Sequence, residues 1–97
     1  MIINEDTTST ASPFAGKVYP NPATNTVTIE IETNKETTVY FQLYDITSKL
    51  LIEEKWPYLN DKFSKSIDVS SISSGIHLIK LFTSETYQVV PICIAKW

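Results

Sequence analysis

The sequence predicts an all-β chain that folds as an antiparallel sandwich of six or seven short strands. Apolar and polar residues alternate in several short windows, and polar turn signals separate these windows at intervals of about 8–12 residues. No window keeps a helical period over two turns. Short alternating segments divided by regularly spaced turns are typical of β-sandwiches.

The first predicted strands show the alternation most clearly. Residues 26–32 place Val, Ile and Ile between Thr and Glu, which predicts a strand with one buried and one wet face. Residues 37–45 repeat this pattern, and further strands are expected at 49–56 and 63–69. Pro57 is expected to end the strand before it, because proline lacks the amide donor of a sheet ladder.

The last two predicted strands differ from the others. Residues 76–83 are apolar on both faces, which is typical of a strand in the centre of a sheet. Residues 86–96 contain Pro91, so this strand is expected at a sheet edge or with a bulge at the proline. Gly75 can adopt the positive φ that the turn before residue 76 requires.

The N-terminal part has another composition. Residues 4–16 are rich in Thr, Ser, Asp, Glu, Pro and Gly, and Phe14 is their one large apolar residue. We therefore expect residues 1–16 to be a flexible linker and residues 17–97 to be the folded domain. The YPNP stretch at 19–22 is stiff and poor in donors, so it is expected to form an entry corner along a sheet edge.

Charge and cysteine content argue against several classes of protein. The 97 residues carry a net charge of −3 with a pI near 5.0, which gives no footprint for nucleic acid or anionic membrane. Cys93 is the single cysteine, so an intramolecular disulfide is excluded. The N-terminus has no basic or apolar region of a signal peptide, so we expect any export signal to lie elsewhere in a longer protein.

The residues give little support to an enzyme. His77 is the one histidine, without a second histidine or suitably spaced thiol, and a structural or surface role is expected for it. The carboxylates lack the spacing of a calcium loop and the cleft of a glycosidase, so no catalytic residue, metal or cofactor is predicted. Aromatic residues leave a binding platform open, with packing across strands as the alternative reading. These residues are Tyr19, Tyr40, Tyr44, Trp56, Tyr58 and Tyr87.

Four segments in this order resemble the type A C-terminal sorting domain of the type IX secretion system. They read YPNPATN at 19–25, VTI at 27–29, LYDITSKLL at 43–51 and IDVSSISSGIHL at 67–78. The resemblance extends from residue 18 to about residue 90. The matching motif positions are Tyr19, Pro20, Asn21, Pro22, Asp45, Lys49, Asp68, Ser70 and Gly75.

This resemblance implies an immunoglobulin-like sandwich of about seven strands at the C-terminus of a larger protein of a Bacteroidetes-type bacterium. Such a domain is not catalytic. It implies a covalently joined N-terminal cargo domain, passage through the periplasm, recognition by the outer-membrane translocon and removal by a surface sortase. The cargo then stays on the cell surface or is secreted.

Three positions depart from the family pattern. Ser48 stands where the turn usually has glycine, so the turn must avoid positive φ or accept strain. His77 replaces the usual tyrosine after Gly75-Ile76. In the last strand Pro91 interrupts what is more often a basic and apolar alternation ending in lysine.

We expect the translocon to recognise the last strand and the sortase to cut within residues 4–16. The expected recognition residues are Val89, Val90, Ile92, Ile94 and Lys96. The alternative function is an immunoglobulin-like binding or spacer module with a carbohydrate or protein partner. An edge strand with an apolar run also makes a dimer through that edge a hypothesis.

Overall fold

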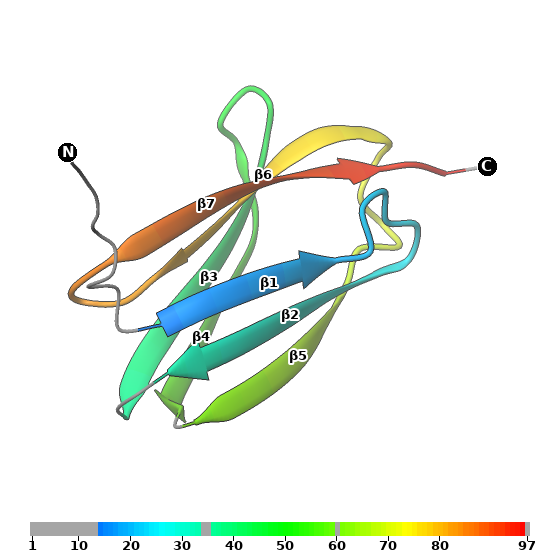
Figure 1. The fold of residues 1–97 in the computed structure, drawn as a ribbon. Coiled ribbons are helices and arrows are strands. Elements are labelled where there is room, and N and C mark those ends of the chain that lie inside the picture. Colours follow the sequence, from blue (N-terminus) through cyan, green and yellow to red (C-terminus); the bar gives the residue numbers. More distant parts are fainter. Residues whose placement is uncertain (1–13, 34–35, 60, 97) are drawn as a thin grey trace, which may run out of the picture.

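The computed structural model describes residues 14–33, 36–59 and 61–96, which form seven strands in two antiparallel sheets (Figure 1). This confirms the predicted β-sandwich. The strands are β1 (Phe14–Tyr19), β2 (Thr26–Thr33), β3 (Thr37–Asp45), β4 (Leu50–Leu59), β5 (Lys62–Asp68), β6 (Gly75–Phe82) and β7 (Tyr87–Ile94).

The strand order agrees with what the sequence predicts about edges and centres. One sheet has the order β1-β2-β5 and the other the order β4-β3-β6-β7. The apolar strand β6 lies between β3 and β7, as expected for a central strand. Strand β7, which contains Pro91, is an edge, and so is β1, which leads into the YPNP corner. Both prolines of that corner follow cis peptide bonds.

The core fills the space between the two sheets. Alternate residues of each strand point inward, and apolar side chains at these positions lose their contact with water. The rings of Phe41 and Trp56 stack there with centroids 5.5 Å apart. The buried apolar residues are Ala23, Val27, Ile29, Ile31, Val39, Phe41, Leu43, Trp56, Leu59, Ile67, Val69, Ile79, Leu81, Ile92 and Ile94.

The strands differ from the sequence prediction at the end of β4 and at β1, which the sequence does not predict as a strand. Pro57 does not end its strand, because β4 continues to Leu59. This is possible because β4 is an edge strand, and its register with β3 shifts between the pairs Val39–Trp56 and Thr37–Leu59. Residues 14–16 of the expected linker form the first half of β1, while residues 1–13 lie outside the described part of the chain.

The two ends of the sandwich are distinct. The start of β1 lies beside the β6–β7 turn, where the Gln88 side-chain amide donates a hydrogen bond to the Gly16 carbonyl at 3.1 Å. Strand β7 ends at the other end of the molecule, next to the loop that joins β1 to β2 (Figure 1). A protein segment that precedes β1 is therefore attached far from the C-terminal end of β7.

Candidate functional site

Three segments that are far apart in the sequence meet where β7 ends. We call residues 21–25, 69–74 and 93–96 the C-terminal clasp. Its centre is a short parallel bridge between Ala23 and Ile94. The Ala23 amide donates to the Cys93 carbonyl, and the Ala95 amide donates to the Ala23 carbonyl, each at 2.8 Å. Ala23 is fully buried, so the entry loop is packed directly onto the last strand.

Asparagine groups add two further bonds to the clasp. The Cys93 amide donates to the Asn21 side-chain oxygen at 2.9 Å. The Val69 amide donates to the Asn25 carbonyl at 2.8 Å, which joins the loop after β5 to the same entry loop. The asparagine between the two prolines thus satisfies a backbone donor on the edge of β7 that would otherwise face water.

Lys96 closes the clasp with its ammonium group. Its Nζ donates to the carbonyls of Thr24 at 2.7 Å, Val69 at 3.0 Å and Ser70 at 3.1 Å. An ammonium group has three donors, so all three find an acceptor. The Lys96 backbone amide also donates to the Ser74 hydroxyl oxygen at 3.0 Å. One side chain therefore connects the entry loop with the turn after β5.

The turn after β5 is organised by Asp68. The Ser70 amide donates to an Asp68 carboxylate oxygen at 2.9 Å. Hydrogen bonds from the Ser70 hydroxyl and then from its amide lower the pKa of Asp68, and the nearby charge of Lys96 lowers it further. Gly75 starts β6 with a φ of +140°, a conformation that favours glycine. Apart from its two neighbours in the chain, no described residue has an atom within 4 Å of where a Cβ would stand, so backbone conformation and not space requires this glycine.

The turn between β3 and β4 is a second ordered feature and contains Asp45 and Lys49. One Asp45 carboxylate oxygen accepts bonds from the Thr47 amide at 2.9 Å, the Thr47 hydroxyl at 2.6 Å and the Lys49 amide at 3.0 Å. The Thr47 hydroxyl bond is the main cause that lowers the pKa of Asp45. Ser48 has a φ of 72°, so this turn adopts the positive φ and accepts its strain.

The expected recognition residues do not form one accessible row. Ile92 and Ile94 are buried in the core, and Val90 is half-buried. Val89 is exposed on the outer face, whereas the half-buried Lys96 is held by the clasp. Contact with all five side chains would require β7 to leave the sandwich.

The free edge of β7 offers few donors to another strand. Backbone groups of a strand point to its two edges in alternation. The amides of Cys93 and Ala95 point away from β6 to residues of the clasp, so the nitrogen of Pro91 also points outward. Pro91 therefore removes an edge donor without costing a bond to β6, which protects the edge from pairing.

The aromatic residues do not gather into one platform. Tyr40 stacks on Phe82 with ring centroids 5.0 Å apart, while Trp56 belongs to the core. The Tyr44 hydroxyl donates to the Gln42 side-chain oxygen, and the Tyr19 hydroxyl donates to Glu30, which raises the pKa of Tyr19. The side chain of Tyr58 lies outside what the structure describes. Tyr19, Tyr40 and Trp56 thus make cross-strand contacts, whereas Tyr44 bonds within its own strand.

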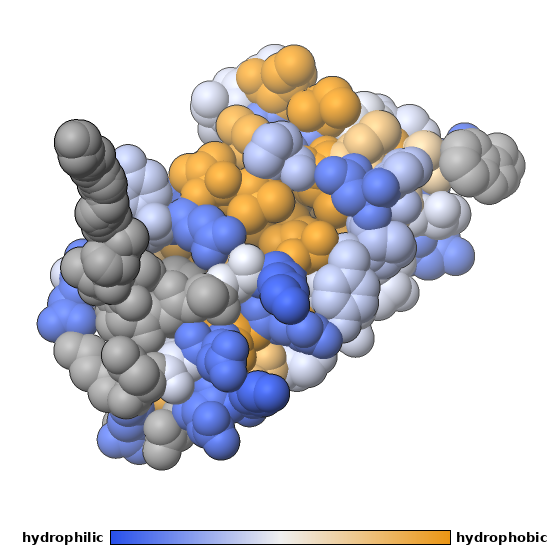
Figure 2. Space-filling model, viewed as in Figure 1, coloured by the Kyte–Doolittle hydropathy of each residue, from blue (hydrophilic) through white to orange (hydrophobic). Residues whose placement is uncertain are grey.

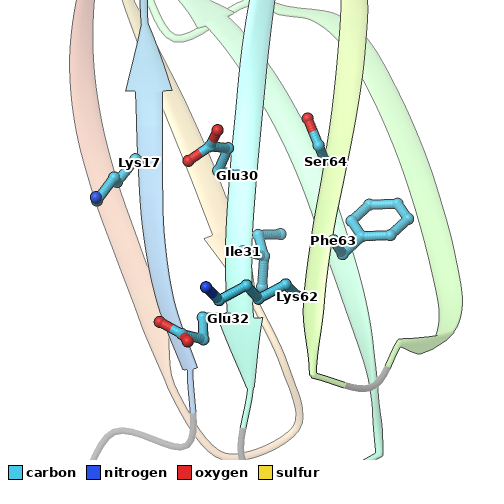
Figure 3. A pocket seen from close by; sticks show the side chains of 7 residues that line it. All are labelled: Lys17, Glu30, Ile31, Glu32, Lys62, Phe63 and Ser64. Atoms are coloured by element: carbon cyan, nitrogen blue, oxygen red, sulfur yellow. The ribbon is translucent and has the colours of Figure 1, made fainter.

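A shallow hollow of about 390 Å³ lies over β1, β2 and β5. Figure 3 shows its charged side chains, Lys17, Glu30, Glu32 and Lys62, on these three strands. Lys17 is paired in register with Glu30, and Lys62 with Glu32, so residues of opposite charge occupy neighbouring positions on adjacent strands. Such pairs are the ordinary coating of a solvated sheet face.

His77 and the carboxylates show no assembled chemistry in the described part of the chain. His77 is buried, with its Nδ1 3.0 Å from the Gly75 carbonyl oxygen. No three His, Cys, Asp or Glu side chains of residues 14–33, 36–59 and 61–96 lie close enough to hold a metal ion. Among the same residues there is no helix long and apolar enough to cross a bilayer.

The chain matches a known protein family. Residues 17–95 match the family described as the secretion system C-terminal sorting domain. The chain therefore belongs to this family, which confirms the resemblance that its motifs indicate. A search of curated protein sequences finds no significant match.

Two solved structures align with most of this chain, and the first of them is similar in fold. The first is dimeric latent PorU from Porphyromonas gingivalis, which is 15% identical to this chain with a TM-score of 0.68. The alignment covers 93% of this chain and 10% of the PorU chain. This chain thus spans about a tenth of the PorU chain. A β-glucosidase from Listeria innocua, in complex with glucose, is 14% identical over 88% of this chain and 16% of its own, with a TM-score of 0.49.

Sequence reasoning missed part of the clasp. It selected Asn21, Asp68 and Lys96, and the structure brings these into one site. It did not select Ala23 or Ser74, although both lie within the segments that resemble the family. The acceptors of Lys96 are main-chain carbonyls, which every residue carries, so no residue type could have indicated them.

Proposed function

We propose that the domain directs a covalently joined N-terminal cargo protein across the outer membrane through the type IX secretion system. The single observation that carries this proposal is the clasp, which holds the family motifs and Lys96 together at one end. The start of β1 lies at the other end, so a cargo joined there leaves the clasp accessible to the translocon.

This arrangement favours recognition of a folded surface over recognition of a linear C-terminal strand. Ile92 and Ile94 are buried, and unfolding the sandwich to expose them would cost most of the stability of a small domain. The translocon therefore reads the outer surface of β7 and of the clasp. The domain itself supplies no catalytic group in this function.

Sortase removal is a further part of the proposal. A protease needs an extended chain that is not paired with a neighbouring strand. Residues 14–16 are paired with residues 31–33 in the first sheet. We therefore narrow the expected cleavage region to the residues that precede Phe14, and the cargo then remains at the cell surface or is secreted.

An export assay tests the proposed function. Residues 1–97 are fused to the C-terminus of a periplasmic reporter with a cleavable signal peptide, in a bacterium that has this secretion system. We expect reporter at the cell surface or in the medium, cut before Phe14 by mass spectrometry. A strain without the translocon is the control. Reporter that stays in the periplasm while the domain is folded would contradict the proposal.

A further inference from the structure

Exposed apolar residues gather on the outer face of the four-stranded sheet, near the clasp. Figure 2 shows hydrophobic residues along β6 and β7 and at the tip of the β3–β4 hairpin, which is the green loop in Figure 1. Ile46 is 77% exposed, and the other members are between 38% and 51% exposed. We call this set the apolar face, and its members are Ile46, Leu50, Ile76, Leu78 and Val89.

The strand register makes the apolar face continuous. Tyr44 is paired with Leu50 on one side and with Leu78 on the other. Leu78 is paired with Pro91, and Val89 stands two positions from Pro91 on the same face. Large side chains at such direct and diagonal positions reach one another. Contiguous exposed apolar surface of this kind marks interaction sites in soluble domains.

The apolar face also meets the clasp. Ile76 is paired with Cys93, whose amide and carbonyl both bond to the entry loop. A partner that covers Ile76 would therefore also contact the end of β7. The start of β1 lies at the far end of the sandwich, so attached cargo does not lie against this surface.

The tip of the face is presented rigidly. Ile46 belongs to the turn in which Asp45 accepts three hydrogen bonds, and the Asp45 amide donates to the Lys49 carbonyl at 3.0 Å. A side chain held by an ordered turn loses little conformational entropy when a partner binds it. Ile46 thus has the geometry of an anchor that inserts into a pocket of the partner.

Charge defines the kind of partner. The outward positions of β6 and β7 carry one charged side chain, Lys80, and its ammonium lies over the rings of Phe82 and Tyr87 at 5.1 and 5.6 Å. Those rings are at the end away from the clasp. On β6 and β7 the part beside the clasp therefore offers an uncharged apolar surface, and Asp45 and Lys49 flank it in the β3–β4 hairpin. Such a surface suits an apolar pocket and not a polyanion.

Three hollows on the described part of the chain do not match such a pocket, which argues against a second copy of this chain as the partner. The hollow over β1, β2 and β5 is lined mainly by charged side chains. Two others near the β6–β7 turn are lined mainly by charged and hydroxyl residues. We infer that the apolar face docks into a concave, uncharged pocket on a protein of the outer-membrane secretion machinery. This inference rests on the proposed function.

Export of the reporter fusion tests the inference. Ile46→Ser with Leu78→Ser removes two anchors, and export is expected to fall about tenfold or more. Tyr87→Ser is the matched control, because Tyr87 is 69% exposed on the same sheet face at the other end, and its export should be unchanged. Circular dichroism checks folding, and Ile46→Ser alone serves if the double variant fails to fold.

Cross-linking identifies the protein that contacts the apolar face. A photoreactive phenylalanine at position 46 is expected to cross-link to an outer-membrane component of the secretion machinery, and one at position 87 is not. Equal cross-linking at both positions, or a cross-link only to a second copy of the domain, would overturn the inference.

The outcomes separate the two proposals. If the unaltered domain exports its reporter and the folded Ile46→Ser, Leu78→Ser variant does so equally well, the docking inference fails and the proposed function stands. If the unaltered domain is not exported, the proposed function fails and the docking inference fails with it.

Discussion

At the scale of single residues, two aspartates each stabilise a turn through side-chain hydrogen bonds. Asp45 and Asp68 accept hydrogen bonds from residues that follow them, and each has a pKa below its ordinary value of 3.8. A carboxyl whose pKa is lowered by folding stabilises the folded state above its unfolded pKa, and this contribution is lost as the pH falls through its folded pKa.

This linkage predicts a specific acid response. Carboxyl resonances of Asp45 and Asp68 should titrate with midpoints below 3.8, and the unfolding free energy should decrease as the pH is lowered below about 4. In Asp45→Asn the decrease should be smaller than in the unaltered chain, because one linked group is gone. A midpoint above 3.8 for Asp45 would contradict the assigned hydrogen bonds.

Ser48, the strained residue of the β3–β4 turn, gives a prediction in which a substitution raises the unfolding free energy. Ser48 has a φ of 72°, which costs a residue with a Cβ about 1–2 kcal/mol. Ser48→Gly is therefore expected to raise the unfolding free energy by about 1 kcal/mol in urea denaturation, since glycine adopts this φ without strain. Ser66→Gly in the middle of β5 is the control and should lower it. A lower unfolding free energy in Ser48→Gly would contradict the backbone strain assigned to Ser48.

Lys96 connects all three segments of the clasp. Lys96→Met keeps the length of the side chain but removes three charge-assisted bonds, so a loss of about 1–3 kcal/mol is expected. Hydrogen exchange of the Cys93 and Ala95 amides should accelerate as the clasp loosens. Lys62→Met, at an exposed position of β5, should leave both the stability and these exchange rates unchanged.

At the scale of elements, the entry loop acts on the last strand through packing as well as hydrogen bonds. Ala23 is fully buried where the loop crosses the end of β7. Ala23→Leu is expected to cost about 1–3 kcal/mol, because a larger side chain must push the loop from Ile94. Calorimetry against Asn25→Leu, an exposed position of the same loop, checks this. Equal melting temperatures for the two variants would refute the close packing.

The ends of the strands show which glycine and proline residues predict local structure correctly. Gly75 and Pro91 occupy the turn and the edge that the sequence predicts for them, since backbone restrictions act locally. Pro57 does not end β4, because an edge strand with a register shift has no ladder bond to lose at that position. Whether a strand lies at an edge depends on the order of all strands in the sheet. A single proline in the sequence does not indicate that order.

At the scale of the whole molecule, one core holds the two sheets together. Phe41 is 1% exposed and stacks on Trp56, so Phe41→Ala is expected to cost about 3–5 kcal/mol. The neighbouring Tyr40 points to the outer face, and Tyr40→Ala should cost clearly less. Urea unfolding of both variants measures the difference. A larger loss in Tyr40→Ala would mean that the assigned inner and outer faces are wrong.

The sequence by itself determined six of the seven strands, the buried faces of β2 and β3, two of the sheet edges and the family. These features follow from alternation along the chain and from proline and glycine, which restrict the backbone wherever they stand. Only the tertiary structure decided that Ile92 and Ile94 are inaccessible and that Lys96 is held by carbonyls of distant segments. Cys93 and Lys96 bond to partners 72 residues earlier, Asn21 and Thr24. No local pattern indicates these pairs, because the Cys93 amide and the Thr24 carbonyl are main-chain groups that every residue type carries, and only the folded chain brings them to their partners.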